Sequence, residues 1–412
     1  MYDFLTESTR LLHSAGELAG IDRAVVELLE EPMRIVAFRI PMRMDDGRRC
    51  IFQAYRVRHN NALGPSRNGT RISPDLTLDE VKALGLLMTI KHAAGQIPAG
   101  GGKGGIAADP NALSSWEYER LCRAYVRYLR LQGPDYDVPG ADIGTDLQSM
   151  AWMLDEFEQI TGRHSLAAVD DKPMILGGSP GGYEATGSGV YDTAREALST
   201  LGMAPHDASV AIQGFGQVGS VAARFFQQAG ARVVAVSDLG GGVYRHGGLD
   251  IEALRAHADE AGTVAGFPGA EAMTNAELLV SDCDILIPAA VQGVITSQNA
   301  GDVRARLVVE GANAPTSVDA DATLIDRGVM IVPDILANSG SVHVCQMERS
   351  QGLSDNRWPL ERVEALRRER QLHAYREAAR AAAAHETASL RLGAWINAME
   401  KLQCAVKTRG WL

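Results

Sequence analysis

One lysine of the chain lies in a setting that suits acid–base chemistry. Lys103 is enclosed by glycines in the run Gly-Gly-Gly-Lys-Gly-Gly at residues 100–105. Glycine permits unusual backbone angles and the close approach of a substrate, and it leaves space around the amine. In a water-poor cleft near Lys91, desolvation and like charge would lower the pKa of Lys103, so that it could act as a general base near neutral pH. A phosphate-binding loop is disfavoured, because Gly104 stands where that motif needs Ser or Thr.

Two other charged residues are candidates for the same site. Asp142 lies in the segment Val-Pro-Gly-Ala-Asp-Ile-Gly-Thr-Asp. By itself, an aspartate in a loop of this composition is usually a turn residue. Lys91 falls near the end of an expected helix, where a cation ordinarily interacts with the helix dipole. Neither residue alone indicates a catalytic role.

A second constellation indicates a dinucleotide site. Gly214, Gly216 and Gly219 form G-x-G-x-x-G between an expected strand and an expected helix, and the next strand ends at Asp238. Gly214 would allow the tight turn, Gly216 the approach of the pyrophosphate and Gly219 close packing of helix on sheet. The helix N-terminus would offer its N–H groups to the phosphates. Asp238 favours NAD over NADP, since it would repel a 2′-phosphate, although the basic pair at 245–246 leaves NADP open.

Helices and strands in two separate parts of the chain must position these residues. The first part is expected to be helical at 77–95, 115–131 and 145–161. From residue 209 short apolar strands alternate with helices, which indicates a parallel sheet. The expected strands are 209–213, 232–237, 284–288, 307–310 and 329–332, and the chain after Pro333 is expected to be helical. We therefore predict an α/β protein whose nucleotide-type domain begins near residue 185.

The composition excludes several classes of protein. The chain has 412 residues, 46% of them hydrophobic, with 43 glycines and a net charge of −11. This composition excludes a disordered or collagen-like chain, and the charge argues against nucleic-acid binding. No apolar run approaches a membrane span, and the five cysteines are scattered. We expect reduced thiols, a cytoplasmic location, and neither a metal site nor a membrane partner.

Motifs along almost the whole chain resemble those of the glutamate/leucine/phenylalanine/valine dehydrogenases, and most of all the glutamate dehydrogenases. They include GGGKGGIAADP, VPGADIGTD, QGFGQVG, VVEGANAPT and VPDILANSGSV. The resemblance implies reversible NAD(P)-dependent deamination of an L-amino acid to its 2-oxo acid and ammonia, with hydride transfer from Cα to nicotinamide. It implies a cleft between a substrate and oligomerisation domain, residues 1–184 with the helices of about 380–412, and an NAD(P) domain, residues 185–379. It also implies a homo-oligomer, often a hexamer.

The same resemblance implies roles for individual residues. Lys103 resembles the catalytic lysine that activates water, Asp142 the proton-transfer carboxylate, and Lys91 the partner of the substrate α-carboxylate. Three further positions resemble cofactor contacts: Thr186 and Asn313 beside the nicotinamide, and Gln217 in the glycine turn.

The substrate side-chain pocket departs from the glutamate dehydrogenase pattern. Arg67 and Asn68 stand where that pattern has Lys and Gly, and Cys345, after Val342, stands where it has Ser. Arg67 keeps a positive charge that can grip a carboxylate, but its geometry differs from that of lysine. Three alternatives therefore stay open: glutamate as substrate, another L-amino acid, or a weakly active regulatory subunit of a glutamate dehydrogenase complex.

Overall fold

The computed structural model describes residues 3–130 and 133–412, and the chain divides into two compact units. The first unit comprises 3–182, 342–364 and 395–412, and the second comprises 183–341 and 365–394. These units differ from the domains expected from the sequence at two segments. Residues 342–364 belong to the first unit because their side chains bond to it, and residues 380–394 belong to the second, where Arg391 is bound. Within the described residues, no helix is both long and apolar enough to cross a membrane.

The first unit is built on a five-stranded mixed sheet in the order β1-β2-β4-β3-β5. β1 and β2 are antiparallel, β2 is antiparallel to β4, and β3 runs parallel to both β4 and β5. The strands are β1 (Arg34–Arg43), β2 (Arg49–Asn60), β3 (Ser66–Ser73), β4 (Gly100–Ala107) and β5 (Asp137–Ala141). The helices are α1 (Phe4–Leu18), α2 (Arg23–Glu30), α3 (Leu78–Ala94), α4 (Ser115–Leu129), α5 (Leu147–Thr161), most of α12 (Gly340–Ser354) and most of α14 (Leu390–Thr408).

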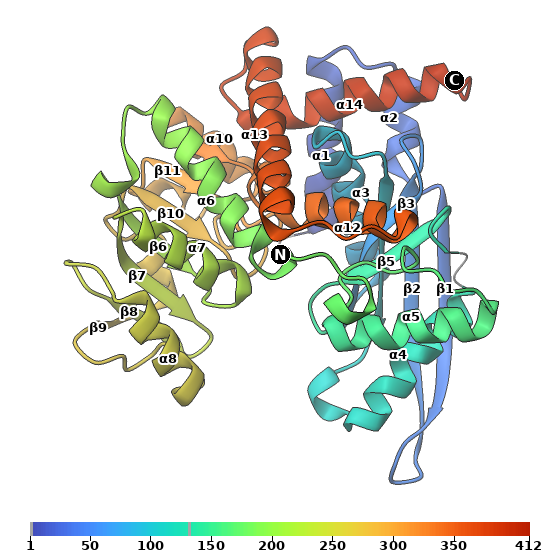
Figure 1. The fold of residues 1–412 in the computed structure, drawn as a ribbon. Coiled ribbons are helices and arrows are strands. Elements are labelled where there is room, and N and C mark those ends of the chain that lie inside the picture. The colour runs from blue at the N-terminus through green and yellow to red at the C-terminus, as the bar shows by residue number, and fades with distance from the viewer. Residues whose placement is uncertain (1–2, 131–132) are drawn as a thin grey trace. The chain divides into compact units, whose positions relative to one another are not determined.

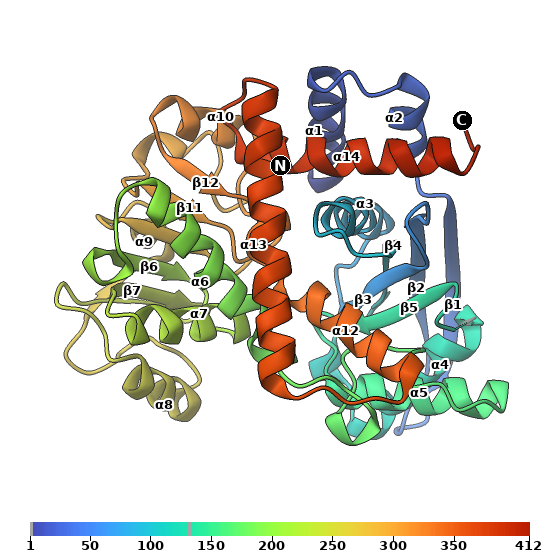
Figure 2. The ribbon, with the colours of Figure 1, turned by 45° about the horizontal axis from the view of Figure 1, so that its top comes forward.

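Helices cover both faces of this sheet (Figures 1 and 2). On one face Val57 of β2 packs with Val81 of α3. On the other, Ala54 and Ile106 share a core with residues of α4 and α5 such as Leu121 and Phe157. Consecutive strand residues point to opposite faces, so β2 contributes to both cores.

The three helices expected in this part of the chain are confirmed, and side-chain caps define where they begin. Thr77 accepts a hydrogen bond from the Glu80 N–H at the start of α3. Ser114 with Glu117 forms a capping box for α4, and Asp146 caps α5. Such caps satisfy N–H groups that the first helical turn leaves without a partner.

The glycine run around Lys103 forms the central strand β4, which is an unusual composition for a strand. A Cβ on Gly101 would lie 2.1 Å from Thr89 Oγ1, and one on Gly104 would lie 2.1 Å from the Tyr125 hydroxyl. These glycines therefore let α3 and α4 approach the strand, and the expectation that they chiefly clear space around the amine needs correction. Gly69 on β3 does that instead, since its Cβ would lie 3.1 Å from Lys103 Nζ.

The second unit contains a seven-stranded sheet in the order β12-β11-β10-β6-β7-β8-β9, parallel from β12 to β7. Its strands are β6 (Ser209–Gln213), β7 (Arg232–Asp238), β8 (Gly241–Tyr244), β9 (Glu271–Met273), β10 (Ile285–Pro288), β11 (Leu307–Val309) and β12 (Met330–Val332). Its helices are α6 (Gly182–Thr200), α7 (Gln217–Gln228), α8 (Ile251–Ala261), α9 (Asn275–Leu279), α10 (Val318–Asp326), α11 (Asp334–Ala337) and most of α13 (Leu360–Ala384). The five expected strands are confirmed.

The chain order of this sheet reverses between β6 and β10, as in Rossmann-type domains, where ligands bind at such a switch point. The strands β8 and β9 were not expected from the sequence. β8 is antiparallel to β7, and β9, which follows α8 in the chain, is antiparallel to β8. This pairing accounts for one glycine of the cluster at 240–248, because a Cβ on Gly242 of β8 would lie 2.9 Å from Met273 Cγ of β9.

Candidate active site

Lys103 and Asp142 meet in the first unit as an ion pair. Lys103 points from the middle of β4, is 3% exposed, and bonds through Nζ to Asp142 Oδ2. Asp142 directly follows β5, and its N–H donates to Thr145 Oγ1 at 2.8 Å. The parallel strands β3, β4 and β5 thus bring together two residues that lie far apart in the sequence.

Arg71 completes this cluster, and the sequence analysis did not assign it a role. Its Nε lies 3.3 Å from Asp142 Oδ2, and its Nη1 lies 2.5 Å from Glu80 Oε1 at the start of α3. The signal available in the sequence was spacing: Arg71 is two residues after Gly69 on the same strand, so both side-chain positions share one face.

The cluster shifts the pKa values of both catalytic candidates. Burial lowers the pKa of Lys103 below its ordinary value, Asp142 opposes this, and Arg71 adds to it. The positive neighbour that lowers the pKa of Lys103 is therefore chiefly Arg71, whereas Lys91 was expected in this role. Burial would raise the pKa of Asp142, but Lys103 and Arg71 together hold it well below its usual range. The pair can hold a proton on Lys103 or release it while Asp142 stays ionised.

Lys91 lies in the last turn of α3, the helix that packs on β4, and is 4% exposed. A buried ammonium needs anionic or dipolar partners, and an incoming carboxylate would supply one. Its expected contact with the substrate α-carboxylate stays a prediction.

Arg67 is buried in a network that already occupies its guanidinium group. Its Nη2 lies 2.6 Å from Asp170 Oδ2 and donates to the Cys345 carbonyl at 2.8 Å. Its Nε also faces Asp170, at 3.2 Å, and its Nη1 donates to Gln346 Oε1 at 2.5 Å. Arg67 is therefore paired with an internal carboxylate, which reduces the positive charge that it could offer to a substrate.

The other residues expected in the side-chain pocket lie around this network. The Cys345 thiol donates to Asp171 Oδ1 at 3.3 Å, and burial raises its pKa well above the ordinary value. Asn68 has a φ of 120° and accepts the Gly69 N–H on its own side chain at 2.8 Å. Val342 packs with Ile97 and Ala99. Their contact with a substrate stays a prediction.

A run of charged residues at 170–172 is the largest feature that the sequence analysis missed here. Lys172 and Glu348 form a buried ion pair. Burial raises the pKa of Glu348 to about 7 although Lys172 opposes this, and burial and Asp170 raise the pKa of Asp171. The sequence signal was the Asp-Asp-Lys run itself, but charge runs are normally solvated, so it did not stand out.

In the second unit, the glycine turn has the geometry that a dinucleotide requires. Gly214 has a φ of 94°, and a Cβ on Gly219 would lie 1.8 Å from the Gly214 carbonyl oxygen. A Cβ on Gly216 would meet no atom within 4 Å, so space is open where a pyrophosphate would approach. Gly216 caps α7 without a side-chain hydrogen bond, which leaves N–H groups at the helix start for phosphate oxygens. Gln217, the first residue of α7, donates to the Tyr183 carbonyl at 2.8 Å.

Asp238 ends β7 as expected, and its carboxylate also holds a neighbouring loop. Oδ1 accepts from Gly240 N at 2.8 Å and from Thr263 Oγ1 at 2.7 Å, and Oδ2 accepts from Val264 N at 2.6 Å. A carboxylate has about four acceptor sites, so Oδ2 keeps capacity for a ribose hydroxyl.

The two expected nicotinamide contacts also lie in the second unit. Thr186 is in the first turns of α6, where Ala185 packs against Gly340. Asn313 follows β11 and accepts from Asn338 Nδ2 at 3.0 Å. Their roles stay predictions.

Comparison with known proteins extends over the whole chain. The family model described as Glutamate/Leucine/Phenylalanine/Valine dehydrogenase matches residues 177–410, and the Glu/Leu/Phe/Val dehydrogenase dimerisation domain matches residues 32–159. The glutamate dehydrogenase of Thermotoga maritima is 42% identical over 100% of this chain and 98% of its own length. The catabolic NAD-specific glutamate dehydrogenase of Bacillus subtilis is 40% identical over 99% of this chain and 96% of its own length.

Solved structures give the same result. The hetero-hexameric glutamate dehydrogenase of Thermus thermophilus, in a leucine-bound form, superimposes with a TM-score of 0.95 at 35% identity, covering 100% of this chain and 98% of that one. The enzyme of Peptoniphilus asaccharolyticus gives 0.86 at 36% identity and covers both chains completely. The chain therefore belongs to the glutamate/leucine/phenylalanine/valine dehydrogenase family.

Proposed function

We propose that this protein catalyses the reversible NAD-dependent oxidative deamination of an L-amino acid, with glutamate as the substrate, to the 2-oxo acid and ammonia. The observation that carries the proposal is the buried pair of Lys103 and Asp142 with Arg71 beside it. The relatives that match across the full chain are named as glutamate dehydrogenases, two of them from Bacillus subtilis as NAD-specific.

The residues of the first unit would divide the chemistry. Lys91 would bind the substrate α-carboxylate and orient Cα. Bound NAD would accept the hydride and its two electrons from Cα. As water attacks the carbon of the resulting iminium group, neutral Lys103 would take one proton of that water, and Asp142 would relay this proton from Lys103 to the nitrogen. The C–N bond would then break, ammonia would leave, and the hydroxyl would lose its proton to Lys103 as the C=O bond forms. Burial of Lys103 supports this role, because it lowers the pKa toward the working pH.

The second unit, residues 183–341 and 365–394, would bind the cofactor, and the first would bind substrate and form the oligomer. The open space at Gly216 and the start of α7 support pyrophosphate binding there. The remaining acceptor on Asp238 favours NAD, because a 2′-phosphate would meet a carboxylate.

The decisive measurement is turnover by the purified chain with a panel of L-amino acids and both NAD and NADP. Glutamate with NAD is expected to give the highest kcat/KM. Lys103→Ala should lower kcat by at least about a hundredfold while the Kd for NAD stays within about twofold. Retained turnover in that variant would show that the catalytic assignment is wrong.

One observation favours a second candidate, a dehydrogenase for another L-amino acid. Arg67 is paired with Asp170, so a distal substrate carboxylate would meet a neutralised cation. Preference for a neutral amino acid in the panel would support this candidate. Absence of turnover with every amino acid would instead support a regulatory subunit, against which the retention of Lys91, Lys103 and Asp142 speaks.

We also propose a homo-oligomer, with a hexamer as its form, in the cytoplasm. β1 is an edge strand of its sheet, and its Ile35 is 40% exposed. Edge strands with apolar side chains readily pair with another chain. The five cysteines are free, as reducing conditions would keep them. Native mass measurement tests the assembly, and a monomer would contradict it.

A further inference from the structure

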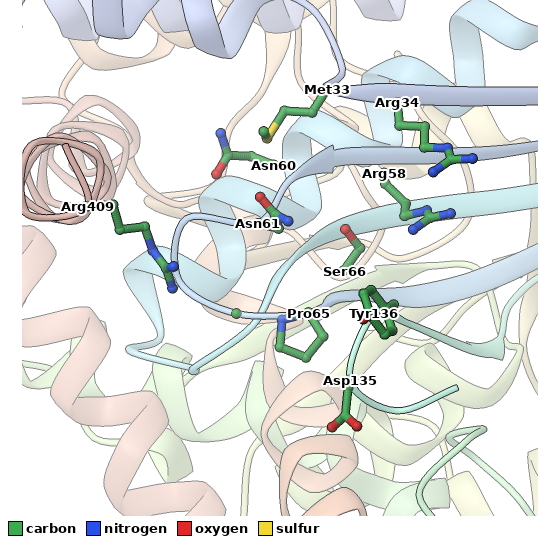
Figure 3. A pocket seen from close by; sticks show the side chains of 11 residues that line it. Met33, Arg34, Arg58, Asn60, Asn61, Pro65, Ser66, Asp135, Tyr136 and Arg409 are labelled. Atoms are coloured by element: carbon green, nitrogen blue, oxygen red, sulfur yellow. The ribbon is translucent and has the colours of Figure 1, made fainter. Parts of the chain in front are cut away.

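A cavity of about 430 Å³ opens at one end of the five-stranded sheet, and none of the proposed catalytic residues lines it. The starts of β1 and β3, the end of β2, the loop before β5 and the end of the chain surround it (Figure 3). We call it the arginine cavity. Its lining residues are Met33, Arg34, Arg58, Asn60, Asn61, Gly64, Pro65, Ser66, Asp135, Tyr136 and Arg409.

Positive charge dominates this lining. The lining contains three arginines, Arg34, Arg58 and Arg409, and one carboxylate, that of Asp135. Arg58 Nε lies 3.9 Å from Asp137 Oδ2, but Asp137 already makes close bonds to Arg56. Burial lowers the pKa of Arg58, Asp137 opposes this, and Arg34 adds to it. An anion in the cavity would relieve this repulsion.

Two polar atoms in the same lining lack a partner among the described residues. They are Asn60 Nδ2 and Ser66 Oγ, and each residue is 1% exposed. A buried polar group without a hydrogen bond has lost its water without compensation, so a ligand that accepts from it is favoured. Both atoms can donate, and the side chains of Asn61, Ser66 and Arg58 lie around the same end of the sheet (Figure 3).

We propose that the arginine cavity binds a small oxyanion through a carboxylate or phosphate group. Guanidinium groups bind both kinds of group through paired hydrogen bonds, and the amide and hydroxyl donors complete the shell. A single acidic residue against three arginines argues against a cationic ligand. This binding does not depend on the proposed reaction.

The site also has a route to the catalytic cluster, and this part rests on the proposed function. Arg58 and Arg56 share Asp137, and Arg56 Nη1 donates to the Asn68 carbonyl at 2.9 Å. Asn68 precedes Gly69, which lies against Lys103. An anion that draws Arg58 away from Asp137 would alter this set of contacts, so bound oxyanion should change kcat by a factor of two or more.

The test uses the full chain, with inorganic phosphate and succinate as probes, titrated calorimetrically at low ionic strength. At least one probe should bind in the Lys91→Ala background, where the expected substrate carboxylate site is removed. Arg34→Ala and Arg58→Gln should each weaken that binding at least tenfold, and Arg23→Ala, at an exposed arginine of α2 outside the cavity, should not. Comparison of the two probes identifies the preferred group.

Two results would overturn the proposal. The first is no binding of either probe at 10 mM, which means a binding free energy weaker than about 3 kcal/mol. The second is equal binding of the probe in the three arginine variants. Because Arg34 is exposed, Arg34→Ala keeps the test valid if Arg58→Gln fails to fold. An anion that binds as proposed but leaves kcat unchanged would overturn only the coupling. Binding without any amino-acid turnover would overturn the proposed function and leave the site standing.

Discussion

Lys103 has two neighbours with opposite effects on its proton. Asp142 stabilises the ammonium form and Arg71 destabilises it, while burial favours the neutral form. Groups this close titrate as a pair, so kinetic pKa values would describe the Lys103–Asp142 cluster as a whole. Arg71 is then the residue through which the pH dependence of the reaction can be adjusted without removal of a proton-transfer group.

Replacement of Arg71 by methionine should shift the rising limb of the kcat/KM–pH profile to higher pH by roughly one unit. Loss of a positive neighbour raises the pKa of Lys103, so the neutral amine forms only at higher pH. Arg71→Lys keeps the charge and should leave the limb nearly in place. A profile that moves to lower pH, or moves equally in both variants, would contradict the electrostatic role.

Asp170 is the second residue whose charge should matter. Asp170→Asn keeps the size of the side chain but releases Arg67 from its ion pair, so kcat/KM for glutamate relative to norvaline should rise about tenfold or more. The variant should also lose roughly 3 kcal/mol of stability, because a buried charge is left unpaired. Asp155→Asn, at an exposed carboxylate, serves as control. An unchanged substrate ratio would place Arg67 outside the side-chain pocket.

The sequence allowed the residue types at the site to be predicted but not all of their pairings. Lys103 and Asp142 were both predicted as site residues from their distinctive motifs, and the structure brings the two side chains together. The partner of Arg67 was not, because Asp170 is 103 positions away and pairs with it only after the strands assemble. The pairing of Asp170 with Arg67 depends on how distant parts of the chain pack together, and local sequence motifs do not show this.

At the scale of secondary structure, the same limit applies to β4. Glycine is depleted in strands, so a strand with five glycines cannot be predicted from propensity. The glycines are required instead by the close approach of α3 at Gly101 and of α4 at Gly104. In contrast, the five parallel strands of the second unit were predicted to within about one residue, because they are short, largely apolar and fully buried segments such as Ser209–Gln213.

Gly101→Ala tests whether this close approach positions Lys91, which α3 carries. The new Cβ would lie 2.1 Å from Thr89 Oγ1 and 2.4 Å from Thr89 N, so α3 must move away from β4. We expect a loss of about 1–3 kcal/mol in the free energy of unfolding and a rise in KM for the amino acid, since α3 carries Lys91. Gly301→Ala, where a Cβ meets nothing within 4 Å, should change neither quantity. A normal KM together with reduced stability would show that this contact stabilises the fold but does not position Lys91.

At the scale of the whole molecule, the C-terminal part of the chain from residue 342 alternates between the two units. Residues 365–394 belong to the second unit, although residues 342–364 and 395–412 on either side belong to the first. Arg391, at the start of α14, is fixed there by a buried network. It bonds to Glu310 after β11 at 2.7 and 2.9 Å and to Asp321 of α10 at 3.0 Å. The sequence predicted helices here, but it did not show which unit each helix joins.

Arg391→Leu should therefore weaken the attachment of this segment in a pH-dependent way. Loss of the arginine leaves Glu310 buried without its cation, which costs about 3–5 kcal/mol near neutral pH. Burial already raises the pKa of Glu310 despite Arg391, and without Arg391 the pKa rises further. A raised folded-state pKa destabilises the protein only where the unfolded carboxyl is ionised, so the loss should shrink as the pH falls toward 4. Urea unfolding at pH 5 and pH 8 measures this difference. As a control, Arg376→Leu removes an exposed ion pair with Glu196 and should cost less than about 1 kcal/mol of stability at either pH. If both variants lose the same stability at both pH values, the buried network does not anchor the start of α14.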